Sequence, residues 1–357
     1  MVDRFRTNLV VACAVVALAI FCTRAHGFGY IFASEFNGVD IVTHPMGYSG
    51  IGGTLNVTVG IDPSSPNASE MVIPTKNVVA TWNAMQPTLS NANVGALGGT
   101  EIDFESVLLH ELGHSIGLAH VNAALESGLT GADRNYTKTT NGANNTFDLD
   151  AGPDGVRGSH DDLRGDDVNL NYFRIADNDP FDTNLGVVDS TTYSRDTADL
   201  PPADAFSANA DRSVSQLARY AAPGTEAVMQ QGTFFSEIQR TLAADDVAGI
   251  LYAEAGLDEL AGTADDYDLL LQYAGQTTSA EIVIAFDNSE TGFAVSKSSR
   301  AFIAPDHYRV ADSDIFFNTG YDWHFNDTLI PEPASAFLLG AAGLALLVRP
   351  ARPTRKR

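Results

Sequence analysis

Apolar residues between positions 105 and 121, ESVLLHELGHSIGLAHV, have the spacing of a helix that is buried along its sides. The apolar sides of this predicted helix are formed by Leu108, Leu109, Leu112 and Ile116. Gly117 follows directly, and a residue without a Cβ suits the sharp turn that ends a helix. A second pattern, the apolar run EIVIAF at 281–286, predicts a strand. The chain therefore combines helical and strand elements.

The first apolar run of the chain has the layout of a secretory signal peptide, which we expect over residues 1–27. Arg4 and Arg6 precede thirteen apolar residues at 9–21, and small residues follow near Ala25. The alternative is a membrane anchor helix, but thirteen residues are too few to cross about 30 Å of hydrocarbon. Both cysteines of the chain lie in this segment. The exported protein therefore has no thiol, which excludes a disulfide framework and cysteine ligands.

The last 27 residues, 331–357, begin with Pro-Glu-Pro, continue with an apolar stretch and end in basic residues. This order resembles the PEP-CTERM sorting tail of exopolysaccharide-producing bacteria. The resemblance implies cleavage by an exosortase-like processing enzyme. It also implies delivery to the cell surface or the extracellular matrix, where exopolysaccharide becomes a partner. A simple C-terminal membrane anchor is the alternative, because fifteen apolar residues at 334–348 are marginal for a span.

The charge balance is strongly acidic. Asp and Glu together number 45 against 21 Lys and Arg, so the formal net charge is -24 at pH 7. A protein that binds the phosphate backbone needs a basic face, so nucleic acid is excluded as a partner. The balance favours an exported protein that binds cations.

The predicted helix carries the residues of a metal site. His110 and His114 lie four positions apart, so both project from one face, and the turn at Gly117 returns His120 as a third nitrogen ligand. Three neutral imidazoles with an open position are typical of catalytic Zn²⁺, which lowers the pKa of its bound water. Glu111 is then the general base, which takes the proton from this water and passes it to the leaving amine.

Residues 110–120 match HExxHxxGxxH, the signature of the metzincin metalloproteases. The segment TEAVMQQGTF resembles the Met-turn of that family, with Met229 at the turn. Residues 240–256 resemble the final helix of the matrixin branch, which carries the pattern L-x-x-D-D-I-x-G-I. Upstream, GTLNVTVGID resembles the first strand of the family and PTKNVVATWNAM its first helix, with a buried Trp82.

The resemblance implies a secreted zinc endopeptidase that hydrolyses peptide bonds in a protein or peptide substrate. It implies an α+β, metzincin-like zincin fold over residues 28–330, in which a twisted mixed β-sheet packs on the zinc helix and a C-terminal helix. Two features depart from the family. Residues 121–225 form a long insertion before the Met-turn, in which 213–221 is a candidate short helix. The Met-x-Pro-x-Tyr sequence is replaced by Met-Gln-Gln-Gly-Thr at 229–233, which changes the specificity pocket.

Two acidic segments share the pattern A-G-x-D-x-x-x-G-x-x-D-D, at 151–162 and 255–266. Closely spaced carboxylates in a Gly-rich loop suit Ca²⁺, which prefers oxygen ligands. The candidate calcium ligands are Asp148, Asp150, Asp154, Asp161, Asp162, Asp258, Asp265 and Asp266. The alternative is a recurrent acidic turn that is only solvated.

A strand-rich segment at 280–326 follows the final helix, whereas the family places its remaining strands before the zinc helix. Its end, DIFFNTGYDW, resembles the family's edge strand. One hypothesis is a rearrangement like a circular permutation, in which 280–326 completes the catalytic sheet. The strand at 314–318 would then border the cleft and pair with an extended substrate. The other hypothesis is a separate small β domain.

The remaining histidines, His44, His160, His307 and His324, lack ligand spacing, so we expect them to be surface or core residues. The main hypothesis from the sequence is a zinc metalloendopeptidase. The rival is a calcium-binding cell-surface or matrix protein whose protease site is vestigial or cleaves only its own insertion. An intact Glu111 argues against the vestigial site, because only catalysis needs the base.

Overall fold

The computed structural model describes residues 27–33, 41–120, 171–173, 183–194, 224–230, 233, 235–288 and 292–330. Its helices are α2 (Val72–Ala84), α3 (Phe104–Ser115) and α5 (Ala244–Glu254). Its strands are β1 (Gly27–Tyr30), β2 (Val42–His44), β3 (Gly53–Ile61), β4 (Glu101–Asp103), β5 (Leu118–Ala119), β6 (Asn171–Phe173), β7 (Tyr193–Ser194), β8 (Tyr267–Gln276), β9 (Ile282–Phe286), β10 (Ala294–Ala304), β11 (His307–Phe317) and β12 (Asp322–His324).

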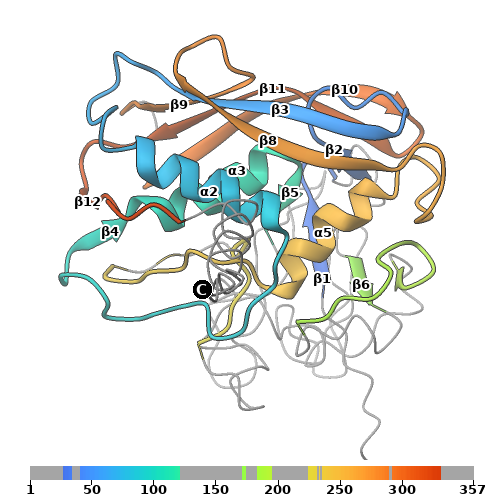
Figure 1. Cartoon of the computed structure of the whole chain (residues 1–357), viewed down its shortest axis with the longest axis horizontal. Helices are drawn as coiled ribbons and strands as arrows, with labels where there is room; N and C mark the ends of the chain where they lie inside the picture. Colours follow the sequence, from blue (N-terminus) through green and yellow to red (C-terminus); the bar gives the residue numbers. More distant parts are fainter. Residues whose placement is uncertain are drawn as a thin grey trace, which may run out of the picture.

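The main sheet has six strands, in the order β10-β11-β9-β3-β8, with β2 paired to β11. All of its pairings are parallel except the antiparallel pair β10–β11. Figure 1 shows this sheet across the top of the view, with α2 and α3 packed beneath it. The protein is thus a mixed α and β fold with a mostly parallel sheet and few helices. This architecture is compatible with the α+β class that the sequence predicts.

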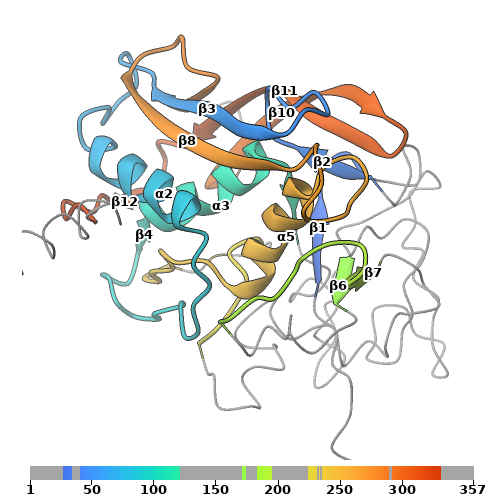
Figure 2. The ribbon, with the colours of Figure 1, turned by 45° about the vertical axis from the view of Figure 1, so that its right-hand side comes forward.

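Strands from both ends of the described chain lie in this one sheet. Strand β3 pairs with β9 through residues 59–61, and β9 pairs with β11. The segment 280–326 therefore does not form a separate small β domain. Its strands β9, β10 and β11 join the strand at residues 53–61 in one sheet, and Figure 2 shows β3, β8, β10 and β11 together across the top of the view.

The prediction that 314–318 forms the edge strand is wrong. Residues 314–317 belong to β11, which lies between β10 and β9. The chain reverses at Asp306, whose φ is 60°, and β10 then pairs with β11 along its whole length. Because this hairpin covers β11, the edge on that side, among the strands that the structure describes, is β10.

Helix α3 has clear start and end signals. The side chain of Asp103 caps its first turn by accepting a hydrogen bond from the backbone N–H of Ser106. The last turn is followed by Gly117, whose φ is +119°. A Cβ at Gly117 would lie 2.5 Å from the carbonyl oxygen of Thr43, so only glycine fits this close approach of β2.

The core lies between the main sheet and the helices, and it confirms the predicted burial. Trp82 on α2 is fully buried, and its indole N–H donates to the carbonyl of Leu109 on α3 at 3.1 Å. The apolar residues predicted to line the helix are all buried: Leu108, Leu109, Leu112 and Ile116. The predicted strand 53–62 and the predicted helices at 74–85 and 240–256 correspond to β3, α2 and α5.

Two smaller sheets extend the structure around α3. Strand β1 pairs with β5, the short strand that leads to His120, and with β6, which pairs with β7. Strand β12 pairs with β4 just before α3. The predicted sorting tail, nearly all of the signal peptide and most of the 121–225 insertion, with the candidate helix 213–221 and His160, lie outside the described residues. In the described part of the chain, no helix combines the length and apolar character needed to cross a bilayer.

Candidate metal centre

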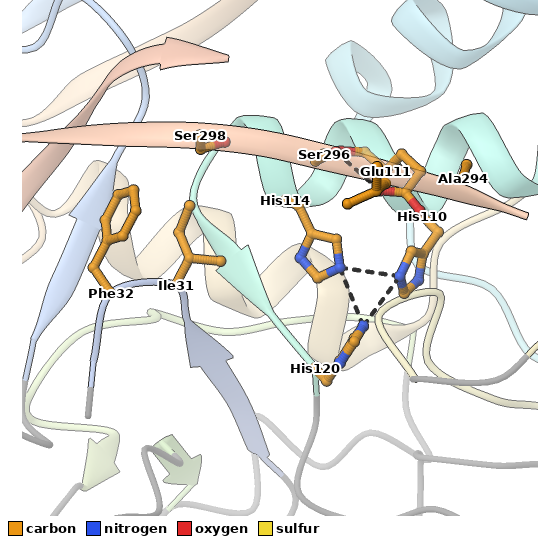
Figure 3. A pocket seen from close by; sticks show the side chains of 10 residues that line it. Ile31, Phe32, His110, Glu111, His114, His120, Ala294, Ser296 and Ser298 are labelled. Carbon is orange, nitrogen blue, oxygen red and sulfur yellow. Dashed lines mark hydrogen bonds between the residues drawn. The ribbon is translucent and has the colours of Figure 1, made fainter. Parts of the chain in front are cut away.

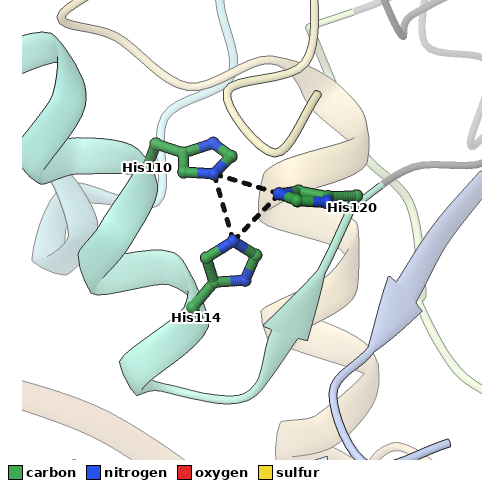
Figure 4. Close-up of side chains that lie close together, drawn as sticks. All are labelled: His110, His114 and His120. Carbon is green, nitrogen blue, oxygen red and sulfur yellow. Dashed lines mark hydrogen bonds between the residues drawn. The ribbon is translucent and has the colours of Figure 1, made fainter. Parts of the chain in front are cut away.

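Three histidine side chains converge at the end of α3. The Nε2 atom of His114 lies 3.0 Å from Nε2 of His110 and 3.2 Å from Nε2 of His120. The third separation, between Nε2 of His120 and Nε2 of His110, is 3.3 Å. Figure 4 shows the three rings pointing at one common centre. The structure therefore brings together all three residues that the sequence assigns to zinc.

Local backbone geometry produces this convergence. His110 and His114 are one helical turn apart, so α3 presents both on the same face. The chain then turns at Gly117 and continues as β5, which pairs with β1 and directs His120 back toward the helix. The glycine and the short strand are thus as necessary to the site as the helix itself.

Hydrogen bonds at the opposite ring nitrogens fix the tautomers of two of these histidines. Nδ1–H of His110 donates to the carbonyl of Val228 at 2.6 Å, and Nδ1–H of His114 donates to the carbonyl of Leu118 at 2.8 Å. In a neutral imidazole the other nitrogen then carries a lone pair. The two Nε2 lone pairs therefore face each other across the centre, an arrangement that is favourable around a cation.

The three residues fit a zinc ion by charge state and by distance. Burial lowers the pKa of His114 to about 3, and burial also places the pKa of His120 well below its ordinary value, so both stay neutral. Nitrogen ligands placed tetrahedrally at about 2.0–2.1 Å from zinc are about 3.3 Å apart. The observed separations of 3.0, 3.2 and 3.3 Å are close to that edge length.

Glu111 lies beside the three histidines and is 7% exposed. Its burial raises the pKa of its carboxyl group, and the electrostatic interaction with the His110 ring and hydrogen bonds from Ser296 oppose this rise. The Ser296 hydroxyl lies 3.0 Å from Oε2 of Glu111. Figure 3 shows the two side chains meeting beneath β10.

Two cavities meet at this point. One, of about 460 Å³, is lined by the three histidines, Glu111, residues 294–296 and 298 of β10, and residues 31–32. The other, of about 320 Å³, lies on the far side of Glu111. It is lined in part by Ser106, Val107, Gln230, Thr233, Gln239 and Phe293. His110, Glu111 and Ala294 line both cavities, so the histidine centre lies in a continuous cleft along the edge strand β10.

Met229 packs against α3, as the Met-turn prediction requires. It is 2% exposed, and a Cβ added at Gly113 would overlap its sulfur atom. The turn is held by Asp246 on α5, whose carboxylate accepts hydrogen bonds from the backbone N–H groups of Val228 at 2.8 Å and Met229 at 3.0 Å. Because the carbonyl of Val228 accepts from His110, Asp246 supports a histidine of the centre through two hydrogen bonds.

Three of the predicted calcium ligands also lie together. One carboxylate oxygen from each of Asp258, Asp265 and Asp266 lies within 4.8 Å of the others. The Thr263 hydroxyl lies within 3.3 Å of all three side chains, and the backbone N–H of Leu257 donates to Asp265 at 2.6 Å. The loop thus supplies its own donors to these carboxylates. The other five candidates, Asp148, Asp150, Asp154, Asp161 and Asp162, lie outside the described residues.

Sequence reasoning missed two residues that support the centre. Ser296 is 185 positions from Glu111, and its only signal is the alternation of small residues at 294, 296 and 298, all of which line the cavity. Asp246 lies in the L-x-x-D-D-I-x-G-I pattern, which predicts the helix but assigns this aspartate no role at the centre. His44 and His307 are core residues, as expected, and they form a stacked pair 3.0 Å apart between Nε2 and Nδ1.

Comparison with protein-family models, curated proteins and solved structures finds no match to this chain. The chemistry of the centre therefore rests on the geometry of its own residues.

Proposed function

We propose that this protein is a zinc-dependent endopeptidase of the metzincin clan, nearest to the matrixins. The single observation that carries the proposal is the convergence of three Nε2 atoms within 3.3 Å, beside the buried carboxylate of Glu111 and in an open cleft. Three neutral nitrogen ligands with an accessible fourth position are typical of catalytic rather than structural zinc.

The metzincin assignment has support beyond the motif. A methionine packs against the histidine helix, and an aspartate of the following helix holds its turn through backbone N–H groups. A mostly parallel sheet covers the helix, and its edge strand β10 runs along the cleft. Relative to the matrixins, the strands β9 to β11 come late in the chain, so we infer a rearrangement like a circular permutation.

In the proposed hydrolysis of a peptide bond, the three histidines bind the metal and Glu111 transfers the proton. Zinc bound by His110, His114 and His120 would polarise the substrate carbonyl and acidify the attacking water. A carboxylate oxygen of Glu111 takes a proton from this water as the water oxygen attacks the carbonyl carbon of the substrate. It then delivers that proton to the nitrogen of the scissile bond, so that the C–N bond breaks and an amine leaves.

The peptide substrate would lie extended along β10. This strand has an unpaired edge among the described strands, so its backbone groups can pair with a substrate backbone. The second cavity, on the far side of Glu111, would hold one substrate side chain. Thr233, which lines this cavity, stands where the matrixin sequence Met-x-Pro-x-Tyr has its tyrosine, so we infer a different side-chain preference.

The proposed setting is the cell surface or the extracellular matrix. It rests on the signal-peptide layout of residues 1–27 and on the sorting-tail layout of 331–357, which would be cut by an exosortase-like enzyme. The acidic composition fits such an exported enzyme.

Replacement of Glu111 by Gln tests the proposal on the zinc-loaded full chain. Zinc content should stay at one ion per chain, because the histidines are untouched. Cleavage of a fluorogenic peptide library should fall by at least ~100-fold, because general-base catalysis contributes about 10²–10⁴-fold. The exposed Glu70→Gln is the matched control and should cleave like the wild type. A chain that binds no zinc, or a Glu111→Gln variant that keeps full activity, contradicts the proposal.

The second candidate is a calcium-binding surface protein with a vestigial or self-processing protease site. The convergence of Asp258, Asp265 and Asp266 favours it. Against it, the centre keeps its base and the hydrogen bonds that orient His110 and His114, which a vestigial site does not need. The same library separates the two, because a vestigial site cleaves no peptide even when it holds zinc.

A further inference from the structure

We propose that Ser296 is a positioning residue that holds the carboxylate of Glu111 in its catalytic orientation. This inference rests on the proposed function and adds to it a residue outside the metal-binding motif. The Ser296 hydroxyl lies 3.0 Å from Oε2 of Glu111 and 2.6 Å from its carbonyl oxygen.

The fold fixes the place of this serine. Ser296 lies on β10, where it pairs with Ile315 of β11, so its backbone is held by the sheet. Alternate residues of a strand share one face, and Ala294, Ser296 and Ser298 all line the cavity at the histidines. Figure 3 shows Ser296 directly over Glu111, whereas Ser298 lies farther along the strand. The hydroxyl of Ser298 is instead paired with Ser313 at 2.9 Å.

The buried position of Glu111 explains why a donor is needed. A carboxylate that is 7% exposed has lost most of its water, and an ionised group in such a place is costly unless hydrogen bonds replace that water. Because Ser296 belongs to the edge strand rather than to α3, its hydroxyl also limits the directions in which the carboxylate can turn.

The Ser296 hydroxyl has one hydrogen and three acceptors within reach, two on Glu111 and the hydroxyl of Ser115. The hydroxyl of Ser115 lies 3.2 Å from the Glu111 carbonyl oxygen and can donate to it. The carbonyl therefore keeps a donor when Ser296 turns its hydrogen to Oε2. Ser115 and Ser296 are 3.4 Å apart, so the two hydroxyls form one group around the base.

The test compares Ser296→Ala with Ser296→Thr in the zinc-loaded full chain, with a fluorogenic peptide as substrate. The Ala variant keeps the backbone of β10 and loses only the hydroxyl. We expect its kcat to fall roughly 10- to 100-fold, the range for a misplaced catalytic group, with KM nearly unchanged. The Thr variant, which keeps a hydroxyl and suits a strand, should recover most of the loss. Ser69→Ala, an exposed position outside β10 and away from both cavities, is the control and should match the wild type.

Three readouts besides activity separate positioning from a general structural role. Zinc content and melting temperature should be unchanged in Ser296→Ala, and its crystal structure should show the Glu111 carboxylate turned away from β10. A kcat loss that comes with lost zinc, with a lower melting temperature or without rescue by Thr overturns the inference. Full kcat in Ser296→Ala also overturns it and leaves the proposed function standing. If the zinc-loaded wild type cleaves nothing, the proposed function fails and this inference falls with it.

Discussion

At the scale of single residues, the centre follows from spacing within one short segment. His110 and His114 lie one turn apart on α3, so helical geometry alone predicts their common face, and Gly117 predicts the turn to His120. Ser296 could not be predicted in this way. Its contact with Glu111 depends on which strand takes the edge of the sheet, and pairing between distant strands has no local signal.

Gly113 gives a test of the packing beneath the histidines. A Cβ at this position would overlap the sulfur of Met229 and lie 3.1 Å from the Trp82 ring. Gly113→Ala should therefore push Met229 away from α3 and destabilise the fold by about 1–3 kcal/mol, a typical cost of overpacking. The better helix propensity of alanine, about 1 kcal/mol, offsets part of this cost.

Chemical denaturation measures the free energy of unfolding in this experiment. Gly99→Ala is the control, because a Cβ there meets no atom within 4 Å, and it should change the free energy by less than about 0.5 kcal/mol. If Gly113→Ala is as stable as Gly99→Ala, Met229 does not pack against α3 as described.

At the scale of elements, the centre depends on contact between α5 and the turn at Met229. Asp246 is 1% exposed and accepts three backbone N–H groups, from Val228, Met229 and Ala243. The sequence predicted α2, α3, α5 and β3, since each has a continuous local pattern. It placed the edge strand at 314–318, because the reversal at Asp306 and the hairpin that covers β11 depend on pairing over distance.

Asp246→Asn tests whether this contact supports the metal site. An amide in place of the carboxylate puts an NH₂ group against at least one backbone N–H, so the turn should loosen and the Val228 carbonyl should hold His110 less firmly. Loss of such a supporting partner typically weakens metal binding about 10- to 100-fold. We expect a zinc Kd raised by that factor, measured by competition with a chelator.

The same chemical change at Asp268, which is exposed on β8, is the matched control and should leave the zinc Kd unchanged. Equal zinc affinity in the Asp246 and Asp268 variants would show that the turn holds His110 without help from α5.

At the scale of the whole molecule, the main sheet joins segments from opposite ends of the chain. His44 on β2 and His307 on β11 are more than 260 positions apart, yet their rings stack in the core. The sequence assigned both to core or surface and could not predict their pairing, because neither lies in a motif with the other. The pair connects the sheet to the acidic loop, since Nε2 of His307 lies 3.6 Å from Oε1 of Glu259.

This pair predicts a loss of stability in acid. Burial and, to a smaller extent, the proximity of His307 lower the pKa of His44 to about 3, although the backbone of Ala253 and the carboxylate of Asp265 act in the opposite direction. Nδ1 of His44 faces the Tyr267 hydroxyl at 3.3 Å, and the Tyr48 ring packs against it. An unfolded histidine has a pKa near 6.5, so between about pH 6.5 and 3 the unfolded chain binds a proton that the folded chain excludes. The contribution of His44 to stability is therefore present above pH 6.5 and is lost as the pH falls.

Urea denaturation of the wild type and His44→Gln at pH 8, 6 and 5 isolates this contribution from that of every other titrating group. At pH 8 His44 is neutral in both states, so the variant differs from the wild type only by lost packing and hydrogen bonds. Below pH 6.5 the wild type alone loses stability through His44, by up to about 1.4 kcal/mol per pH unit. The stability advantage of the wild type should therefore shrink toward pH 5. An advantage that stays constant with pH would mean that His44 is as easily protonated in the folded protein as in the unfolded chain, and that the stacked pair does not exclude the proton.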